Sequence, residues 1–574
     1  MTQLFRHRGL RIIGLLAAVV VGAVWLLLPP AAREATPLAG GPPTARGAYH
    51  MHSDRSDGSG SVDDIAAAAA RAGLQFIVIT DHGDGTREPD APQYRHGVLV
   101  IDAVELNTTS GHLVALRIPA APYPLAGTAA DVMEDVRRLG GFGIAAHPDS
   151  ARTTLGWTAW AVAVDGVEWI NADSSWRDEP ATALARAVLG YPIRPAGAVA
   201  WLLDRPVELL ARWDAMGATR SVPALAAADA HARISLRDPG ADDDTSALQL
   251  PVPGYEAVFR AFSNHVVLDE ALTGAATPDA TAVVNAIAHG RVFTVIDALA
   301  SPGGLAFTAA AGGAVAHMGA SVALEAGVTL RARVSGPPGT TLRLMRDGVV
   351  VHDSGDADVS LTASGPGVYR VEAHVPGAPG TPPIPWVLSN PIYVGLPRPP
   401  AASGGPPDAP LSRIPARAAE AATEHGTGDL SELVDAQLAD ARARQLAGEQ
   451  PIGWRFALSS GTPAGQFAAV QLPVAGGVSA FERIRFTVRS AAPLRAWLQL
   501  RAGPATERWG KTFYADEEPR VVELSLRDFL PIGATSTAAP PLARIDSLLF
   551  VVDTLNSRPG ATGSVTLSDI AFVR

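Results

Sequence analysis

Cysteine is absent from the 574 residues of this chain. Disulfide scaffolds, zinc fingers, iron–sulfur clusters and thiol nucleophiles are therefore excluded, and any bound metal must be held by histidine, aspartate or glutamate. Positive charge is also scarce, because 46 basic residues stand against 57 acidic ones. No basic block occurs after the first eleven residues, so nucleic-acid binding through phosphate neutralisation is not expected.

Long disordered stretches cannot make up the whole chain, because 47% of its residues are hydrophobic and only 18% are charged. The length predicts two to four domains. One uncharged run, from Ile12 to Leu28, follows Arg6, Arg8 and Arg11. As a helix it would be roughly 26 Å long, close to the thickness of a bilayer core.

We interpret residues 1–46 as a membrane anchor or signal segment followed by a tether. The three arginines predict an inner-membrane anchor with the rest of the chain facing the periplasm or cell exterior. A cleaved signal with secretion is the alternative, but Ala31 to Ala35 is a poor cleavage site. A buried helix of a soluble domain is a further alternative, disfavoured because such a helix seldom lacks a polar face.

The remaining sequence falls into four regions that differ in their residue pattern. Between residues 47 and 303, apolar runs alternate with helical stretches, which predicts parallel strands with crossovers in an α/β layer or barrel. Residues 304–395 alternate in short strands, as in a small immunoglobulin-like β-sandwich. Residues 396–428 form a linker rich in proline, alanine and glycine. Residues 429–574 begin with a helical stretch and continue as eight strands, which predicts a jelly-roll sandwich similar to galactose-binding and carbohydrate-binding modules.

Histidine is concentrated at the ends of the predicted strands of residues 47–303. Seven of the 14 histidines lie between His50 and His231, and carboxylates accompany them. Strand ends of a parallel barrel converge on one rim, and burying many ionisable groups there without a cation would cost several kcal/mol apiece. We therefore predict a cluster of Zn, Mn or Fe ions. Its candidate ligands are His50, His52, Asp57, His82, Glu105, His112, His147, Asp229 and His231.

The segments HMHSDRSDG, ITDHGD, the strand of Glu105, AAHPDS and AADAH resemble, in this order, the motifs of the polymerase and histidinol phosphatase (PHP) superfamily. The resemblance covers Gly47 to about Gly240, and more loosely to Ala300. It implies a distorted seven-stranded β/α barrel with two or three divalent metals. It assigns one metal to His50, His52, Glu105 and Asp229, a second to Glu105, His112 and His147, and a third to Asp57, His82 and His231.

A narrower resemblance is carried by the sandwich after the PHP-like region and by the phrase WVLSNPIYV, from Trp386 to Val394. Both are similar to the extracytoplasmic branch related to carbaryl hydrolase, the CehA/McbA-like branch. This resemblance implies carbamate or amide cleavage rather than phosphate cleavage.

The expected reaction needs no nucleophilic side chain, because two or three cations can activate a water as hydroxide for attack on phosphorus or a carbonyl carbon. We expect Asp229 to orient the water or accept its proton, and His147 or His231 to protonate the leaving oxygen. Asp81 is expected to hold a neighbouring imidazole from behind the ligands.

Four further residues are candidates for substrate binding. Arg152 and Arg233 follow ligand histidines and could clamp an anion, although ordinary surface positions explain them equally well. Asn171 and Glu168 close a strand on the same rim, where substrate contact and strand capping are alternatives.

We expect an exported, metal-dependent phosphoesterase acting on a small-molecule or phosphoester substrate. Hydrolysis of a carboxyl ester, carbamate or amide at the same centre is the alternative reaction. A glycan- or envelope-binding protein with a structural metal is a third alternative, with glycan bound by the jelly roll, for which Trp497, Trp509 and Tyr514 are candidate stacking residues.

Overall fold

The computed structural model describes residues 28–235, 249–250, 252–324, 327–396, 422–425, 452–458, 460, 466–474, 476–503, 507–533, 535 and 537–574. The expected membrane segment lies outside these ranges apart from Leu28, as does the helical stretch expected at 430–448. Within the described ranges, every helix is too short or too polar to cross a bilayer.

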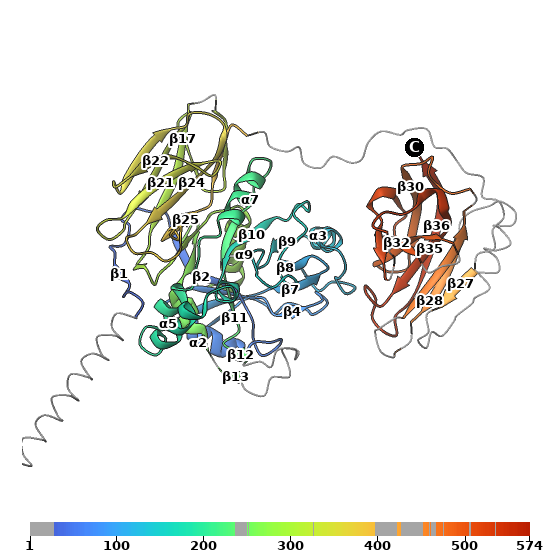
Figure 1. Cartoon of the computed structure of the whole chain (residues 1–574), viewed down its shortest axis with the longest axis horizontal. Helices are drawn as coiled ribbons and strands as arrows, with labels where there is room; N and C mark the ends of the chain where they lie inside the picture. Colours follow the sequence, from blue (N-terminus) through green and yellow to red (C-terminus); the bar gives the residue numbers. More distant parts are fainter. Residues whose placement is uncertain are drawn as a thin grey trace, which may run out of the picture. The chain divides into compact units, whose positions relative to one another are not determined.

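The chain divides into two compact units (Figure 1). The first consists of Met1–Gly83, Pro89–Pro119 and Val136–Ala402, and the second of Asp84–Glu88, Ala120–Asp135 and Ser403–Arg574. The predicted α/β region and the sandwich expected at 304–395 thus share the first unit, apart from the two short segments assigned to the second.

The first unit contains a sheet whose strands pair in a closed ring. Strand β2 (Thr44–Met51) lies between β3 (Phe76–Ile79) and β11 (Ala224–Ala230), parallel to both. Parallel pairing continues from β3 to β6 (Val98–Asp102), and from β11 through β10 (Gly166–Asn171) to β9 (Phe142–Ala145). The carboxyl ends of these parallel strands therefore lie on the same side of the structure.

Strand β8 (Gly111–Leu116) closes the ring in the opposite direction, because it is antiparallel to both β9 and β7 (Val104–Thr108). The expectation of parallel strands throughout is wrong here. Only Thr109 and Ser110 separate β7 from β8, which suffices for a hairpin but not for a crossover, since a crossover needs about a dozen residues or more.

Helices and short strands complete this region. Helix α2 (Val62–Arg71) begins with a capping box in which Ser61 and Asp64 satisfy each other's backbone amides, and it buries Ile65 and Ala69. The other helices are α4 (Ala172–Ser175), α5 (Ala181–Gly190), α6 (Pro195–Ala200), α7 (Val207–Gly217), α8 (Tyr255–Ala261) and α9 (Ala276–Ala288), and α3 (Ala129–Arg138) begins in a segment assigned to the second unit. The remaining strands are β1 (Arg33–Glu34), β4 (His82–Gly83), β5 (Gln93–Arg95), β12 (Ile234–Ser235), β13 (Gln249–Leu250), β14 (Ser263–Val267), β15 (Val292–Val295) and β16 (Ala300–Ser301).

A β-sandwich from β17 to β26 follows this region. One sheet has the order β18 (Ala314–His317), β17 (Leu305–Ala311), β20 (Thr329–Val334) and β23 (Asp358–Thr362). The other strands are β19 (Ser321–Val322), β21 (Thr341–Arg346), β22 (Val349–Ser354), β24 (Gly367–His374), β25 (Val387–Ser389) and β26 (Ile392–Val394). Strand β25 also pairs with β15, and buried Arg370 of β24 lies 2.8 Å from Asp214 of α7, so this sandwich is joined to the α/β region.

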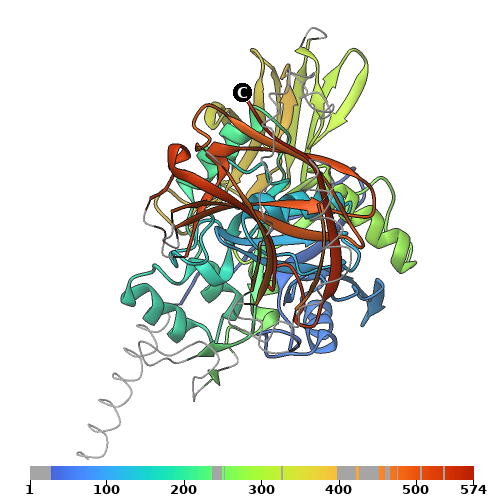
Figure 2. The same cartoon turned by 90° about the vertical axis from the view of Figure 1, so that its right-hand side faces the viewer.

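The second unit contains a two-sheet sandwich in which the eight expected strands all form. One sheet has the order β27 (Ala422–His425), β29 (Phe467–Pro473), β35 (Ile545–Asp553), β31 (Leu494–Ala502), β32 (Arg508–Ala515) and β34 (Leu530–Ile532). The other has the order β28 (Ile452–Ala457), β36 (Thr562–Val573), β30 (Arg483–Ser490) and β33 (Arg520–Ser525), and η3 (Leu526–Asp528) and η4 (Leu542–Arg544) are short 3₁₀ turns. These strands are orange to red in Figure 2.

Two expectations for this region change. Residues 422–425, expected in the linker, form β27 and pair with β29. Trp509, a candidate for glycan stacking, is fully buried in the core between the sheets, and its indole donates a hydrogen bond to the carbonyl of Thr537. A ring in this position cannot stack on a glycan.

Candidate metal centre

The strand ends of the first unit carry unusual backbone conformations where ligands were predicted. His50, His147 and Asp229 have φ angles of 65°, 31° and 41°, in the left-handed region that side chains other than glycine rarely adopt. They lie at the ends of β2, β9 and β11. Strain of this kind is concentrated at functional sites, and here it turns side chains of three strands toward one another.

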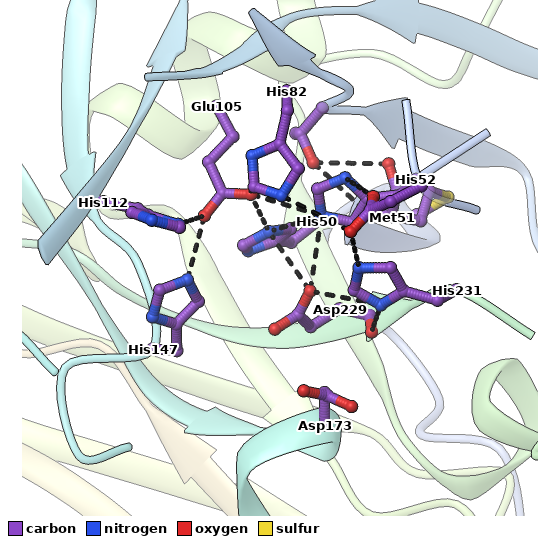
Figure 3. Close-up of polar contacts among 12 residues, drawn as sticks. His50, Met51, His52, His82, Glu105, His112, His147, Asp173, Asp229 and His231 are labelled. Carbon is purple, nitrogen blue, oxygen red and sulfur yellow. Dashed lines mark hydrogen bonds and ion pairs between the residues drawn. The ribbon is translucent and has the colours of Figure 1, made fainter. Parts of the chain in front are cut away.

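Glu105 of β7 is the centre of the cluster (Figure 3). Its carboxylate is only 1% exposed, and its Oε1 lies 2.9 Å from both His112 Nδ1 and His147 Nε2. Its Oε2 lies 3.2 Å from the Nε2 atoms of His50 and His52, and 3.4 Å from His82 Nδ1. One carboxylate is therefore within reach of five imidazoles.

Asp229 contacts two of the imidazoles that lie near Glu105. Its Oδ1 lies 3.3 Å from His52 Nε2 and 3.5 Å from His50 Nε2. The side chains of His50 and His52 are fully buried. These three residues place one ligand atom each within 4.8 Å of the others.

Asp57 lies close to three imidazoles, of which those of His82 and His231 are partly exposed. Its Oδ2 lies 3.2 Å from His231 Nε2 and 3.6 Å from His82 Nε2, and its Oδ1 lies 3.4 Å from His52 Nδ1. The side chains of Asp57, His82 and His231 are 38%, 30% and 19% exposed. This edge of the cluster is the part that faces solvent.

The nine candidate ligands thus come together, but their grouping is not quite the one that the resemblance implies. Three sets could each hold an ion, namely His50, His52 and Asp229, then His82, Glu105 and His112, then His52, Asp57, His82 and His231. His147 lies outside these sets and joins the cluster through Glu105 Oε1.

The carboxylates and imidazoles of the cluster shift each other's pKa values. Burial alone would lower the pKa of His52, but hydrogen bonds to Asp229 and Glu105 raise it to about 9. Burial is likewise outweighed at His147, where Glu105 raises the pKa to about 9. Burial opposes the charged form of Glu105, yet the surrounding imidazoles, led by His50, hold its pKa well below the usual range.

The donor set fits divalent metal ions. Imidazole nitrogens and carboxylate oxygens without thiolates suit Zn, Mn or Fe. Buried His82 Nδ1 makes no hydrogen bond to any described residue, although it lies 3.4 Å from Glu105. Burial lowers the pKa of His82, which keeps the imidazole in the neutral form that binds metal.

Asp81 is buried, but it does not hold an imidazole among its described contacts. Its Oδ1 accepts hydrogen bonds from the Ser53 amide at 2.7 Å and the Ser56 hydroxyl at 2.8 Å, and its Oδ2 accepts one from the Ser53 hydroxyl at 2.6 Å. These bonds hold the loop that carries Asp57.

Tyr255 is a supporting residue that the sequence did not indicate. Its hydroxyl donates to the carbonyl of His52 at 2.8 Å, lies 3.2 Å from the carbonyl of His231, and accepts from the Gly60 amide. It ties the backbones of two ligands from a position 203 residues after His52. No local pattern could have revealed this contact.

The candidate substrate-binding residues have different positions. Arg233 reaches the edge of the cluster, with Nη1 donating to the carbonyl of Asp57 at 3.4 Å. Arg152 lies in the loop after His147, where its carbonyl accepts hydrogen bonds from Leu155 and Gly156. Asn171 is buried and bonded to Asp229. A cavity of about 340 Å³ is lined by His147, Glu168 and Asn171 together with residues of α4 and α7.

No family model matches the sequence, and no curated protein matches it. Among solved structures, the chain is similar to a two-domain protein of Bacteroides vulgatus described as containing a predicted PHP-like metal-dependent phosphoesterase. The identity is 14%, over 60% of this chain and 94% of that chain, with a TM-score of 0.27. It is also similar to a family 11 carbohydrate-binding module of Clostridium thermocellum in complex with a mixed-linked tetrasaccharide. Here the identity is 15%, over 27% of this chain and 83% of the module, with a TM-score of 0.18. At such identities and scores neither likeness determines what this chain does.

Proposed function

We propose that this chain is a metal-dependent hydrolase that cleaves phosphomonoesters or phosphodiesters. The observation that carries the proposal is the position of Glu105, buried within reach of five imidazoles, three of which also lie close to Asp57 or Asp229. Two or three divalent cations bound there would supply an activated water and polarise a phosphoryl oxygen. A structural site would be closed, whereas Asp57 and His231 face solvent.

The side chains at the solvent-facing edge support this reaction. His231 is the better placed of the two expected proton donors, because its Nε2 points to Asp57 at the exposed edge while its Nδ1 bonds the carbonyl of Asp229. His147 is buried, with one nitrogen near the Leu155 carbonyl and the other at Glu105, so a ligand role suits it better. Asp229 keeps Oδ1 toward His50 and His52 and can orient a water there.

The reaction class is tested with purified, metal-loaded protein on nitrophenyl phosphate, a nitrophenyl phosphodiester, a nitrophenyl carboxyl ester and a nitrophenyl carbamate. We expect hydrolysis of a phosphoester with the highest kcat/KM. A preference for the carboxyl ester or carbamate would overturn the phosphoesterase assignment and favour the alternative reaction at the same centre.

The alternative of a binding protein with a structural metal is tested by His50→Ala. On the proposed function, this variant loses turnover while its fold, measured by circular dichroism, is kept. If the wild-type protein hydrolysed none of the esters but bound a mixed-linked glucan, glycan or envelope binding would be favoured.

We also propose that the chain is exported and held at the membrane by residues 12–28. Three arginines before this uncharged run and few charges after it support that orientation. The full chain should then stay in the membrane fraction after an alkaline carbonate wash. Recovery of a shortened chain in the soluble fraction would instead indicate cleavage and secretion.

A further inference from the structure

Two buried polar side chains lie directly behind the candidate ligands and are not themselves in any of the three ligand sets. Glu168 is completely buried and Asn171 is 5% exposed. Both belong to β10, which lies between β9, followed by His147, and β11, which carries Asp229. Their place between these two strands lets them contact ligands on either side.

Glu168 uses both carboxylate oxygens on metal-ligand residues. Its Oε1 lies 2.5 Å from His50 Nδ1, and its Oε2 accepts the backbone amide of His147 at 2.6 Å. When His50 binds a metal through Nε2, this carboxylate would accept the hydrogen that Nδ1 then carries. Nε2 faces Glu105 Oε2 and Asp229 Oδ1, at 3.2 and 3.5 Å.

Asn171 extends the same contacts to Asp229. Its Nδ2 donates to Glu168 Oε2 at 3.1 Å and to Asp229 Oδ2 at 3.0 Å, while its Oδ1 accepts from the Ser174 amide at 3.0 Å. The amide cannot turn over without placing its carbonyl oxygen against two carboxylates. Both hydrogens of Nδ2 are thus committed, so the expected role in binding substrate gives way to one behind the ligands.

The backbone explains how residues three apart reach one site. In a regular strand Glu168 and Asn171 would project from opposite faces. The pairing of β10 with β11 shifts register between Glu168 and Ile170, and such an irregularity turns the following side chains to the other face. The bulge therefore places both side chains under the cluster.

We propose that Glu168 and Asn171 form a positioning pair that sets the orientation of His50, His147 and Asp229 for metal binding. This inference rests on the proposed function, because it concerns how the same centre is assembled. Carboxylates that accept the second ring N–H of a metal-binding histidine fix its tautomer and strengthen it as a ligand. Here the carboxylate of Glu168 contacts two histidines. The amide of Asn171 bonds both to this carboxylate and to Asp229, the third candidate ligand.

The test is a calorimetric titration of the full, metal-free chain with Zn²⁺ alone. Glu168→Gln keeps the size of the side chain but removes its charge, and we expect the affinity of the site formed by His50, His52 and Asp229 to fall roughly 10- to 100-fold. The site of His82, Glu105 and His112 should keep its affinity. A purely structural role would lower the thermal stability of the metal-free protein without weakening one site selectively.

Matched variants keep the result interpretable. Glu270→Gln removes an exposed carboxylate of the same unit and should bind Zn²⁺ as the wild type does. Asn171→Ala should weaken the same site as Glu168→Gln, and Glu168→Asp should restore part of the affinity. If Glu168→Gln and Asn171→Ala both kept the wild-type Zn²⁺ affinity at both sites, the proposal would be overturned. Failure of the wild-type protein to bind Zn²⁺ would overturn the proposed function instead.

Discussion

Replacing Glu105 with glutamine should lower kcat by about a thousandfold or more. A lost metal–carboxylate interaction removes several kcal/mol of transition-state stabilisation, and each 1.4 kcal/mol or so is a factor of ten in rate. The neutral amide would also leave five imidazoles without their shared counter-charge. Metal analysis of the variant should therefore show at least one equivalent fewer than the wild type.

The matched control is again Glu270→Gln, which changes an exposed side chain of the same type. It should keep the wild-type kcat and metal content. If Glu105→Gln retained full metal content and turnover, the role of Glu105 as the shared ligand would be wrong. Circular dichroism of both variants separates a loss of metal from a loss of fold.

The free energy of unfolding of the metal-free protein should fall as the pH rises from 6.5 to about 9. The pKa values of His52 and His147 are both raised from 6.5 to about 9 in the folded chain. Their charged forms, paired with Glu105 and Asp229, stabilise the folded state fully below pH 6.5. This contribution, on the order of a few kcal/mol, is lost as the two imidazoles release their protons near pH 9.

Bound metal should reverse this trend. Metal needs the neutral imidazole, so protons compete with it and binding strengthens as the pH rises toward 9. Thermal unfolding at pH 6, 7.5 and 9, with EDTA or with Zn²⁺, measures both effects. The increase in stability on adding Zn²⁺ should become larger as the pH rises. If the stability of the metal-free protein stayed constant or rose over this pH range, the pairing of charged His52 and His147 with Glu105 and Asp229 would be contradicted.

That the candidate ligands lie close together could be predicted from the sequence, because their positions depend on a regular feature. His50, His82, Glu105, His147 and Asp229 each lie in or just beyond an apolar run, and parallel strands bring such ends together. The convergence of these side chains followed without knowledge of any tertiary contact. The grouping of ligands into separate ion sites did not, because it depends on distances of a few ångströms between residues far apart in the sequence.

The contacts of the supporting residues could not be predicted, because they too depend on distances between residues far apart in the sequence. Glu168 and Asn171 reach one face only because β10 has a bulge, which a period of two residues cannot reveal. Tyr255 reaches the carbonyl of His52 across 203 residues of sequence. Asp81 was expected to hold a neighbouring imidazole, but its described partners are the hydroxyls of Ser53 and Ser56.

One of two corrected expectations had a signal in the sequence, and the other did not. The interval of two residues between β7 and β8 is too short for a parallel connection, so the hairpin was predictable. Trp509 alternates with Arg508 and Gly510 in a strand, and that pattern alone left open which face of the sheet is buried. The structure places the indole in the core.

The metal content of the purified full chain tests the central claim most directly. Elemental analysis after dialysis against metal-free buffer should give two or three equivalents of Zn, Mn or Fe per chain, because six imidazoles converge on the carboxylates of Glu105, Asp57 and Asp229. Less than one equivalent in a correctly folded protein, and no uptake on adding these metals, would contradict the account.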